Sequence, residues 1–292
     1  MGLFQNFPKT DTQVPAYKEY VAPSTRPRLF LCMLREHFWN LIPLNLLQLA
    51  FYLPAVVWTV FNGIRFYAYF FRAQPMSDAG VLALLQSYCL GLVPCLLLAD
   101  MSAGGSALIT RNWARDQRAE VWADFWHGIA ANWSKSLRFS AITAALPLIY
   151  YGYLSFIVLN PAHFDVSGVP LLFTGIATLL WLGMKHVCAL IMVTYRLSWK
   201  DVLRNGFLLA MRQLPRSLGL FLLRMLPLGV GITILLFFSA KGAAFYLLFY
   251  YCTIGFALDW LLKSSHANWL CEEYMNIHID GASSRIGLRP KE

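Results

Sequence analysis

Long runs of apolar residues, separated by short polar stretches, dominate the pattern of this chain. Several of these runs exceed the ~18 residues from which a membrane-spanning helix can be inferred. They fall into three pairs: 38–61 with 79–109, 136–159 with 169–195, and 216–238 with 243–262. The pattern predicts an all-α membrane protein with about six transmembrane helices in three hairpins. The run 79–109 is longer than one span needs, so we expect it to tilt or to extend beyond the bilayer.

The segments outside these runs are too short for a separate soluble domain. We therefore expect an N-terminal segment with an interfacial helix at 1–37, a six-helix bundle at 38–262 and a tail at 263–292. Lys and Arg crowd into the first segment, the tail and the links 110–138 and 196–216. The opposite loops hold only Arg65, Arg72 and Lys241. By the positive-inside rule, both termini are expected in the cytoplasm, with the bundle in a bacterial cytoplasmic (inner) membrane.

Two stretches ahead of hairpins carry an apolar face at helical spacing. The first face comprises Trp122, Phe125, Trp126, Ile129 and Trp133, and the second comprises Trp199, Leu203, Phe207, Met211 and Leu214. Such helices can lie in the membrane interface with the apolar face toward the acyl chains. Alternatively, they can pack against the ends of the bundle. Both alternatives stay open, and both can hold together.

The two stretches also open a repeated unit. Trp122-x-Asp124 is followed by Gly128, and Trp199-x-Asp201 is followed by Gly206. The runs before them carry Ala107-Leu108-Ile109 and Ala189-Leu190-Ile191. The pattern indicates an interfacial helix, a proline-bearing span, a short loop and a return span, repeated in the same orientation.

Proline recurs within the outgoing spans, at Pro54, Pro147 and Pro227. Each proline removes one helical hydrogen bond and can kink its helix. Two interpretations apply: the kinks shape the bundle, or they form a hinge or a cavity wall.

Small residues gather on the second span. Ala99, Ala103 and Ala107 are spaced by four, with Gly104-Gly105 between them. Small residues at this spacing let membrane helices approach closely. We expect this stretch to be the packing centre of the bundle, with a role in lining a polar cavity as the alternative.

Four ionisable residues lie inside the apolar runs: Asp100, Lys185, Arg224 and Asp259. A charge in the bilayer core costs about 2.5–3.5 kcal/mol on insertion scales, so such residues usually face the bundle interior and pair. Asp100 and Lys185 lie at similar depth in the second and fourth spans, and Arg224 and Asp259 are a second candidate pair. The pairs are either structural or part of an ion or substrate pathway. Glu272-Glu273, by contrast, is expected to be solvated in the tail.

Composition supports the membrane assignment and excludes several other classes. The chain is 58% hydrophobic and only 13% charged, about half the charged share of a soluble domain. The net charge of +9 is spread through short loops, so we expect no nucleic-acid binding. The six cysteines include no CxxC pair, and no phosphate-binding, dinucleotide or hydrolase motif is present. We expect no enzymatic activity, no cofactor and no metal.

Several motifs resemble the YesL family of bacterial membrane proteins. They include Phe38-Trp39-Asn40-Leu41, Leu53-Pro54, Ala103-Gly104, Thr110-Arg111-Asn112-Trp113, Trp122-Ala123-Asp124-Phe125-Trp126 and Ile286-Gly287-Leu288-Arg289-Pro290. One departure is that this chain reads Asp100-Met101-Ser102 where the family is expected to have Gly-Pro. The resemblance implies a Gram-positive bacterium and a gene neighbourhood of carbohydrate importers, and it transfers no catalytic residue.

The expected function is therefore an accessory role in oligosaccharide uptake, beside an ATP-driven importer. The expected partners are the lipid bilayer and the importer subunits. Two alternatives remain: a transporter or channel in its own right, indicated by the buried charges and kinked spans, and a lipid-interacting scaffold, indicated by the interfacial helices.

Overall fold

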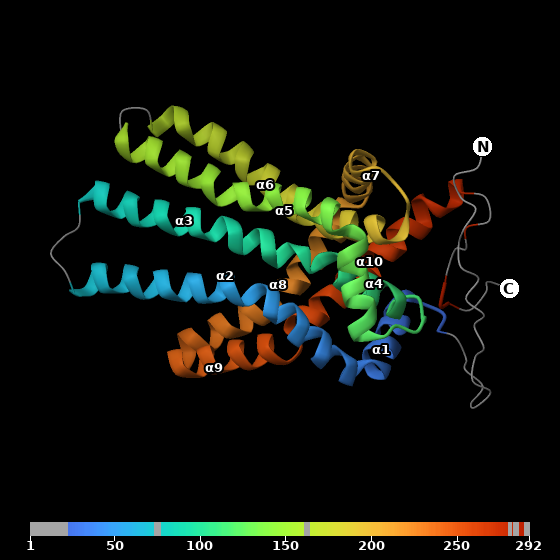
Figure 1. Cartoon of the computed structure of the whole chain (residues 1–292). Helices are drawn as coiled ribbons and strands as arrows, with labels where there is room; N and C mark the ends of the chain where they lie inside the picture. The colour runs from blue at the N-terminus through green and yellow to red at the C-terminus, as the bar shows by residue number, and fades with distance from the viewer. Residues whose placement is uncertain (1–22, 73–76, 161–163, 280–281, 283–285, 289–292) are drawn as a thin grey trace.

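The computed structural model describes residues 23–72, 77–160, 164–279, 282 and 286–288 (Figure 1). These residues form helices and contain no strand. The α-helices are α1 (Arg26–Glu36), α2 (Phe38–Arg72), α3 (Asp78–Met101), α4 (Ala103–Trp113), α5 (Val121–Leu159), α6 (Phe164–Thr194), α7 (Trp199–Arg212), α8 (Leu214–Phe237), α9 (Ala240–Tyr250) and α10 (Phe256–Tyr274). A short π-helix, η2 (Tyr251–Gly255), joins α9 to α10, and a 3-10 turn, η3 (Asn276–His278), follows α10.

Six helical stretches are long and apolar enough to cross a membrane. They are Phe38–Tyr69, Asp78–Trp113, Val121–Leu159, Gly168–Thr194, Leu214–Phe237 and Ala240–His278. The all-helical class and the number of potential spans are confirmed for the described residues. The stretches Asp78–Trp113 and Ala240–His278 each combine more than one helix, which the sequence pattern did not predict.

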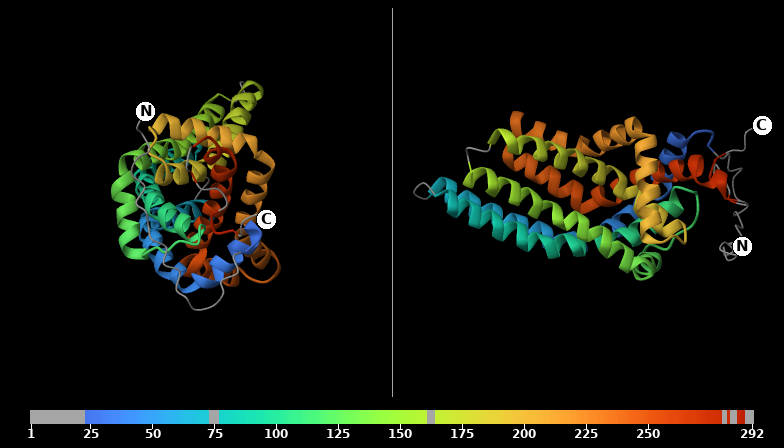
Figure 2. Two further views of the ribbon diagram at one scale, coloured as in Figure 1. Left: turned by 90° about the vertical axis from the view of Figure 1, so that its right-hand side faces the viewer. Right: turned by 90° about the horizontal axis from the view of Figure 1, so that it is seen from above.

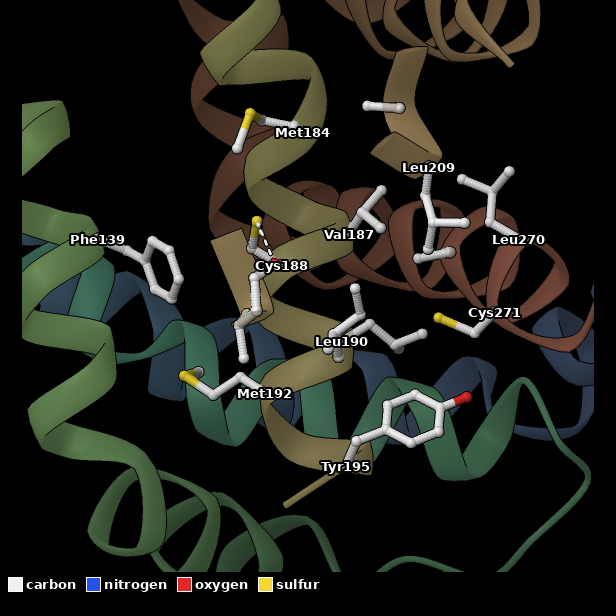
Figure 3. Close-up of a cluster of buried hydrophobic side chains, with 14 of the residues drawn as sticks. Phe139, Met184, Val187, Cys188, Leu190, Met192, Tyr195, Leu209, Leu270 and Cys271 are labelled. Atoms are coloured by element: carbon white, nitrogen blue, oxygen red, sulfur yellow. Dashed lines mark hydrogen bonds between the residues drawn. The ribbon is translucent and has the colours of Figure 1, made fainter. Parts of the chain in front are cut away.

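The helices pack unevenly along the long axis of the molecule. Figure 1 shows α2, α3, α5 and α6 projecting to one end, whereas α1, α4 and α7 gather at the other end. The buried hydrophobic clusters draw mostly on that second end, with side chains from the end of α6, α7 and α10. Figure 3 shows part of this cluster, in which Tyr195 and Cys271 lie near Leu190. The projecting helices instead expose large apolar side chains along much of their length.

The residues of the expected packing centre are divided between two helices, with Ala99 in α3 and the others in α4. α3 ends at Met101, and α4 begins at Ala103 after a turn at Ser102. The Ser102 hydroxyl donates to the Ala99 carbonyl at 2.7 Å. Serine that bonds back to its own helix favours bending, and the following glycine pair has low helix propensity. The run predicted as one helix at 79–109 is therefore divided, and α4 is free to take its own direction.

α4 is almost completely enclosed by other helices. Ala103, Ala107, Ile109 and Trp113 are buried, as are both glycines of this helix. Gly104 and Gly105 lie against the backbone of α5: an added Cβ atom would stand 2.7 Å from the Gly128 carbonyl oxygen and 2.4 Å from the Phe125 carbonyl oxygen, respectively. Only glycine permits a helix crossing this close.

Polar bonds fix the end of α4 to α6 and α10. The Arg111 guanidinium donates to the Val193 carbonyl at 2.8 Å, and Arg115 donates to the Asn268 side-chain oxygen at 3.1 Å. The hydroxyls of Thr110 and Ser264 lie 2.7 Å apart. Two of the basic residues in the link 110–138 thus bond to neighbouring helices as well as contributing positive charge.

The repeated unit has a structural counterpart. Gly128 of α5 packs on α4, and Gly206 of α7 packs on the equivalent part of α6, where an added Cβ atom would stand 2.3 Å from the Cys188 sulfur. The equivalent aromatic residues Trp113 and Tyr195, each six residues after the repeated alanine, are both buried. In both the second and the third unit, a glycine of the short amphipathic segment thus packs closely on the preceding helix.

The expected tail boundary at residue 263 does not coincide with a helix end. α10 continues to Tyr274, and Ala267, Leu270 and Cys271 are buried within it. The expectation that Glu272 is solvated is wrong, because Glu272 is buried and forms an ion pair with Arg26. Viewed along the bundle, α10 lies toward the middle of the other helices (Figure 2). Because this stretch is rich in polar residues, the sequence pattern did not predict that it lies inside the bundle.

The two predicted amphipathic faces are divided between core and surface. In α5, Phe125 is fully buried, whereas Trp122, Trp126 and Trp133 remain exposed. In α7, Phe207 and the other predicted apolar residues are exposed or half-buried, with Trp199 half-buried. The buried face of α7 instead consists of Val202, Gly206, Leu209 and Ala210.

The three prolines lie inside continuous helices, Pro54 in α2, Pro147 in α5 and Pro227 in α8. In Figure 1, α2 changes direction part-way along its length. None of the three prolines divides its helix.

The glycine crossing gives a first prediction. Gly105→Ala should destabilise the protein, since the new methyl group would overlap the Phe125 carbonyl, and overpacking typically costs about 1–3 kcal/mol. Gly175→Ala is the matched control, because an added Cβ atom on that helical glycine meets nothing within 4 Å. Thermal unfolding in detergent should show a lower Tm for the first variant only. Equal Tm values would show that the crossing tolerates a side chain.

Candidate functional site

Five charged side chains meet inside the bundle and form what we call the charged cluster. Its members are Asp100 of α3, Lys185 of α6, Arg224 of α8, and Asp259 and Lys263 of α10. Four helices that are distant in sequence thus place their charges in one region. Because burying a charge is costly, the arrangement of partners decides what this region can do.

The first pair is the one that the matched depths predicted. The Lys185 Nζ atom lies 2.5 Å from Asp100 Oδ2. The Asp100 side chain is 9% exposed and that of Lys185 is 22% exposed. Asp100 occupies the last turn of α3, immediately before the break at Ser102. The bond therefore ties the break between α3 and α4 to the neighbouring α6.

The second group is a triad. Arg224 binds Asp259 through Nε and, at 3.3 Å, through Nη2. Lys263, one turn further along α10, places its Nζ atom 2.5 Å from the same carboxylate. Sequence reasoning placed Lys263 in the tail, but its ammonium group lies within the bundle and 4.6 Å from the centre of the Trp260 ring. The triad connects α8 to α10.

The two groups lie within electrostatic range of each other. Lys263 interacts with the charges of both Arg224 and Lys185. Tyr52 of α2 interacts with both carboxylates, Asp100 and Asp259. The cluster contains three cations and two carboxylates, which leaves one excess positive charge. A cluster of this sign attracts anions rather than cations.

A polar stripe on α2 faces the same helices, and sequence reasoning missed it. Asn45 caps the π-helix: its amide donates to the Tyr251 carbonyl at 2.8 Å and accepts from the Phe256 backbone N–H at 2.8 Å. Gln48, three residues later, is fully buried, and neither of its amide atoms has a partner among the described residues. A buried amide normally finds partners, so Gln48 is available to a bound molecule. The spacing of Asn45, Gln48 and Tyr52 was the available sequence signal.

Two histidines lie close together in the interior. His186 Nε2 and His266 Nδ1 are 3.3 Å apart, which makes one ring a donor and the other an acceptor. The described residues contain no group of three or more His, Cys, Asp or Glu side chains that could hold a metal ion. The histidine pair joins α6 to α10 beside the charged cluster.

The two grooves that stand out on the described residues lie away from the charged cluster. One, of about 350 Å³, is lined by Lys135, Arg138, Ser198, Trp199 and neighbouring residues of α5. The other, of about 450 Å³, is lined by Ile149, Gly152, Tyr153 and Phe156 of α5. No member of the charged cluster lines either groove.

No family model, curated protein or solved structure matches the chain. The resemblance to the YesL family stays a prediction, and what the site can do has to be argued from its geometry.

The Asp100–Lys185 bond gives a second prediction. Asp100→Asn or Lys185→Met alone would leave one buried charge without its partner, which typically costs about 3–5 kcal/mol. Each single variant should therefore lower the Tm in detergent, and the double variant should recover much of the loss. Simple addition of the two losses would mean that the residues are not coupled.

Proposed function

We propose that the chain is a non-enzymatic protein of the bacterial cytoplasmic membrane, accessory to oligosaccharide uptake beside an ATP-driven importer. Its resemblance to a family found next to carbohydrate importers supports the uptake process. The distribution of apolar surface supports the accessory role.

The observation that carries this proposal is the exposed apolar surface of α8 and α9. α8 and α9 contact each other extensively, but α8 has few contacts with α6, α7 and α10. Leu222, Leu226, Leu236 and Phe245 of this pair are more than half exposed. The groove at Gly152 is a recess on the part of α5 that we place inside the membrane, where a side chain of a partner helix can pack. Helices of another membrane protein bind such surfaces by close packing on small residues.

The proposed placement has three membrane hairpins, with α2 and α3, α5 and α6, and α8 with α9 and α10 as outgoing and returning helices. α5 has 39 residues, about 58 Å of helix, which exceeds the ~30 Å hydrocarbon core. Its first turns, with exposed Trp122 and Trp126, therefore belong in the cytoplasmic interface together with α7. Both chain termini are then cytoplasmic, in agreement with the distribution of Lys and Arg.

A transporter or channel is the second candidate, and the charged cluster is the observation that favours it. Charges on four helices, the free amide of Gln48 and the π-helix lie together in the interior. π-helices occur frequently at functional sites. Against this candidate, every cluster member already has an ionic partner within the chain. The pairs therefore hold helices together without help from a solute. A lipid-interacting scaffold is the third candidate, supported by the exposed tryptophans of α5.

The membrane placement gives a third prediction. A fluorescent protein fused after residue 292 should fold and fluoresce, because it stays in the cytoplasm. Alkaline phosphatase fused after residue 160 should be active, because it reaches the outer side. Reporters that place residues 160 and 292 on the same side of the membrane would overturn the three-hairpin placement.

The accessory role gives a fourth prediction. Purification in mild detergent from cells grown on a complex glycan should recover importer subunits with the chain. Gly152→Leu should reduce that recovery about tenfold, since a misfit at a packed contact costs about 1–3 kcal/mol. Gly63→Leu is the matched control, because that glycine also meets nothing within 4 Å.

The second candidate is tested in the same preparation. If the chain alone, reconstituted in liposomes, moves oligosaccharides, and if the stable Asp100→Asn/Lys185→Met variant does not, the transporter replaces the accessory role. Repeated recovery of the chain without importer subunits would count equally against the accessory role.

A further inference from the structure

The groove between α5 and α7 combines positive charge with aromatic surface. Its volume is about 350 Å³, and Lys135, Arg138, Trp133 and Trp199 are among its lining residues. The Arg138 guanidinium carbon lies 5.8 Å from the centre of the Trp199 ring. Two cations and two indole rings thus enclose one recess.

The cations of this groove are free to bind an external anion. Lys135 and Arg138 form no ion pair with any described residue. The nearby carboxylate of Asp201 is engaged by the Ser198 hydroxyl at 2.5 Å, at the start of α7. Lys200, next to Trp199, is exposed and adds further positive charge. The local balance around the groove is therefore cationic.

The groove also lies at the depth of a lipid headgroup in the proposed placement. α7 runs across one end of the bundle (Figure 2), and the exposed Trp122, Trp126 and Trp133 of α5 belong to the same end. Tryptophan favours the boundary between headgroups and acyl chains. Guanidinium and ammonium groups between membrane helices on the cytoplasmic side bind phosphate headgroups.

We propose that this groove is a binding site for the phosphate of an anionic phospholipid from the cytoplasmic leaflet. Arg138, oriented by Trp199, and Lys135 contact the phosphate oxygens, while Trp133 and Trp199 lie along the glycerol and upper acyl region. The proposal rests on the membrane placement above but not on the accessory role.

The test uses the full-length chain, delipidated in dodecyl maltoside and titrated with dioleoyl phosphatidylglycerol. Native mass spectrometry should show a bound lipid, and phosphatidylcholine should bind far more weakly. Lys135→Ala/Arg138→Ala should weaken phosphatidylglycerol binding roughly 30-fold, from about fivefold for each cation near a membrane surface. Arg118→Ala/Arg204→Ala is the control, because it removes the same charge from exposed positions outside the groove.

An equal loss in the control would mean general attraction to a basic surface and would overturn the site. Displacement of the lipid by millimolar inorganic phosphate would assign the groove to a free anion instead. A photoactivatable phosphatidylglycerol gives a readout on the unaltered chain. Its crosslinks should fall within 130–138 or 198–199. Crosslinks confined to other segments would overturn the proposal, and this readout holds even if the double variant fails to fold.

The membrane placement is tested separately by the reporter fusions. Failure of lipid binding with correct reporter topology would overturn the groove alone, whereas reversed topology would remove the basis for both.

Discussion

The close crossing of α4 and α5 is the constraint on which the rest of the structure depends. At this crossing, Gly104 and Gly105 lie against the backbone of Phe125 and Gly128, with no room for a side chain. Close backbone contact between small residues is a main source of attraction between the helices of membrane proteins. Once α4 is seated there, its other faces meet α6 and α10, and the buried clusters form around it.

The charged cluster extends this arrangement into the apolar part of the bundle. Two of its ionic contacts join helices from different parts of the chain: Asp100–Lys185 joins α3 to α6, and Arg224–Asp259 joins α8 to α10. A misplaced helix would leave a charge without a partner, at a cost far above that of a lost apolar contact. The ion pairs thus favour one arrangement of the helices. Apolar contacts alone would not specify that arrangement.

The sequence predicted the parts of the fold that repeat or that are chemically exceptional. Apolar runs revealed six potential spans, and rare charges at matched depth revealed the contact between Asp100 and Lys185. It did not reveal the break at Ser102 or the length of α10. Both also depend on tertiary partners: Gly128 of α5 leaves room for α4 to cross closely, and Glu272 at the polar end of α10 pairs with the distant Arg26. Nor did the sequence distinguish Lys263 of the cluster from the other basic residues expected in the tail.

The π-helix between α9 and α10 limits which insertions and deletions the chain can accept during evolution. A π-turn holds one residue more than an α-turn, so it rotates everything after it by about 100° relative to a continuous α-helix. Asn45 stabilises this offset through three bonds to the backbone at Tyr251, Phe256 and Ala257. Loss of a single residue between 251 and 255 would turn Asp259 and Lys263 away from Arg224 and leave the amide of Asn45 without its partners. The spacing of this short segment is therefore under tighter constraint than its side chains, and length changes are expected to be tolerated in the loops rather than here.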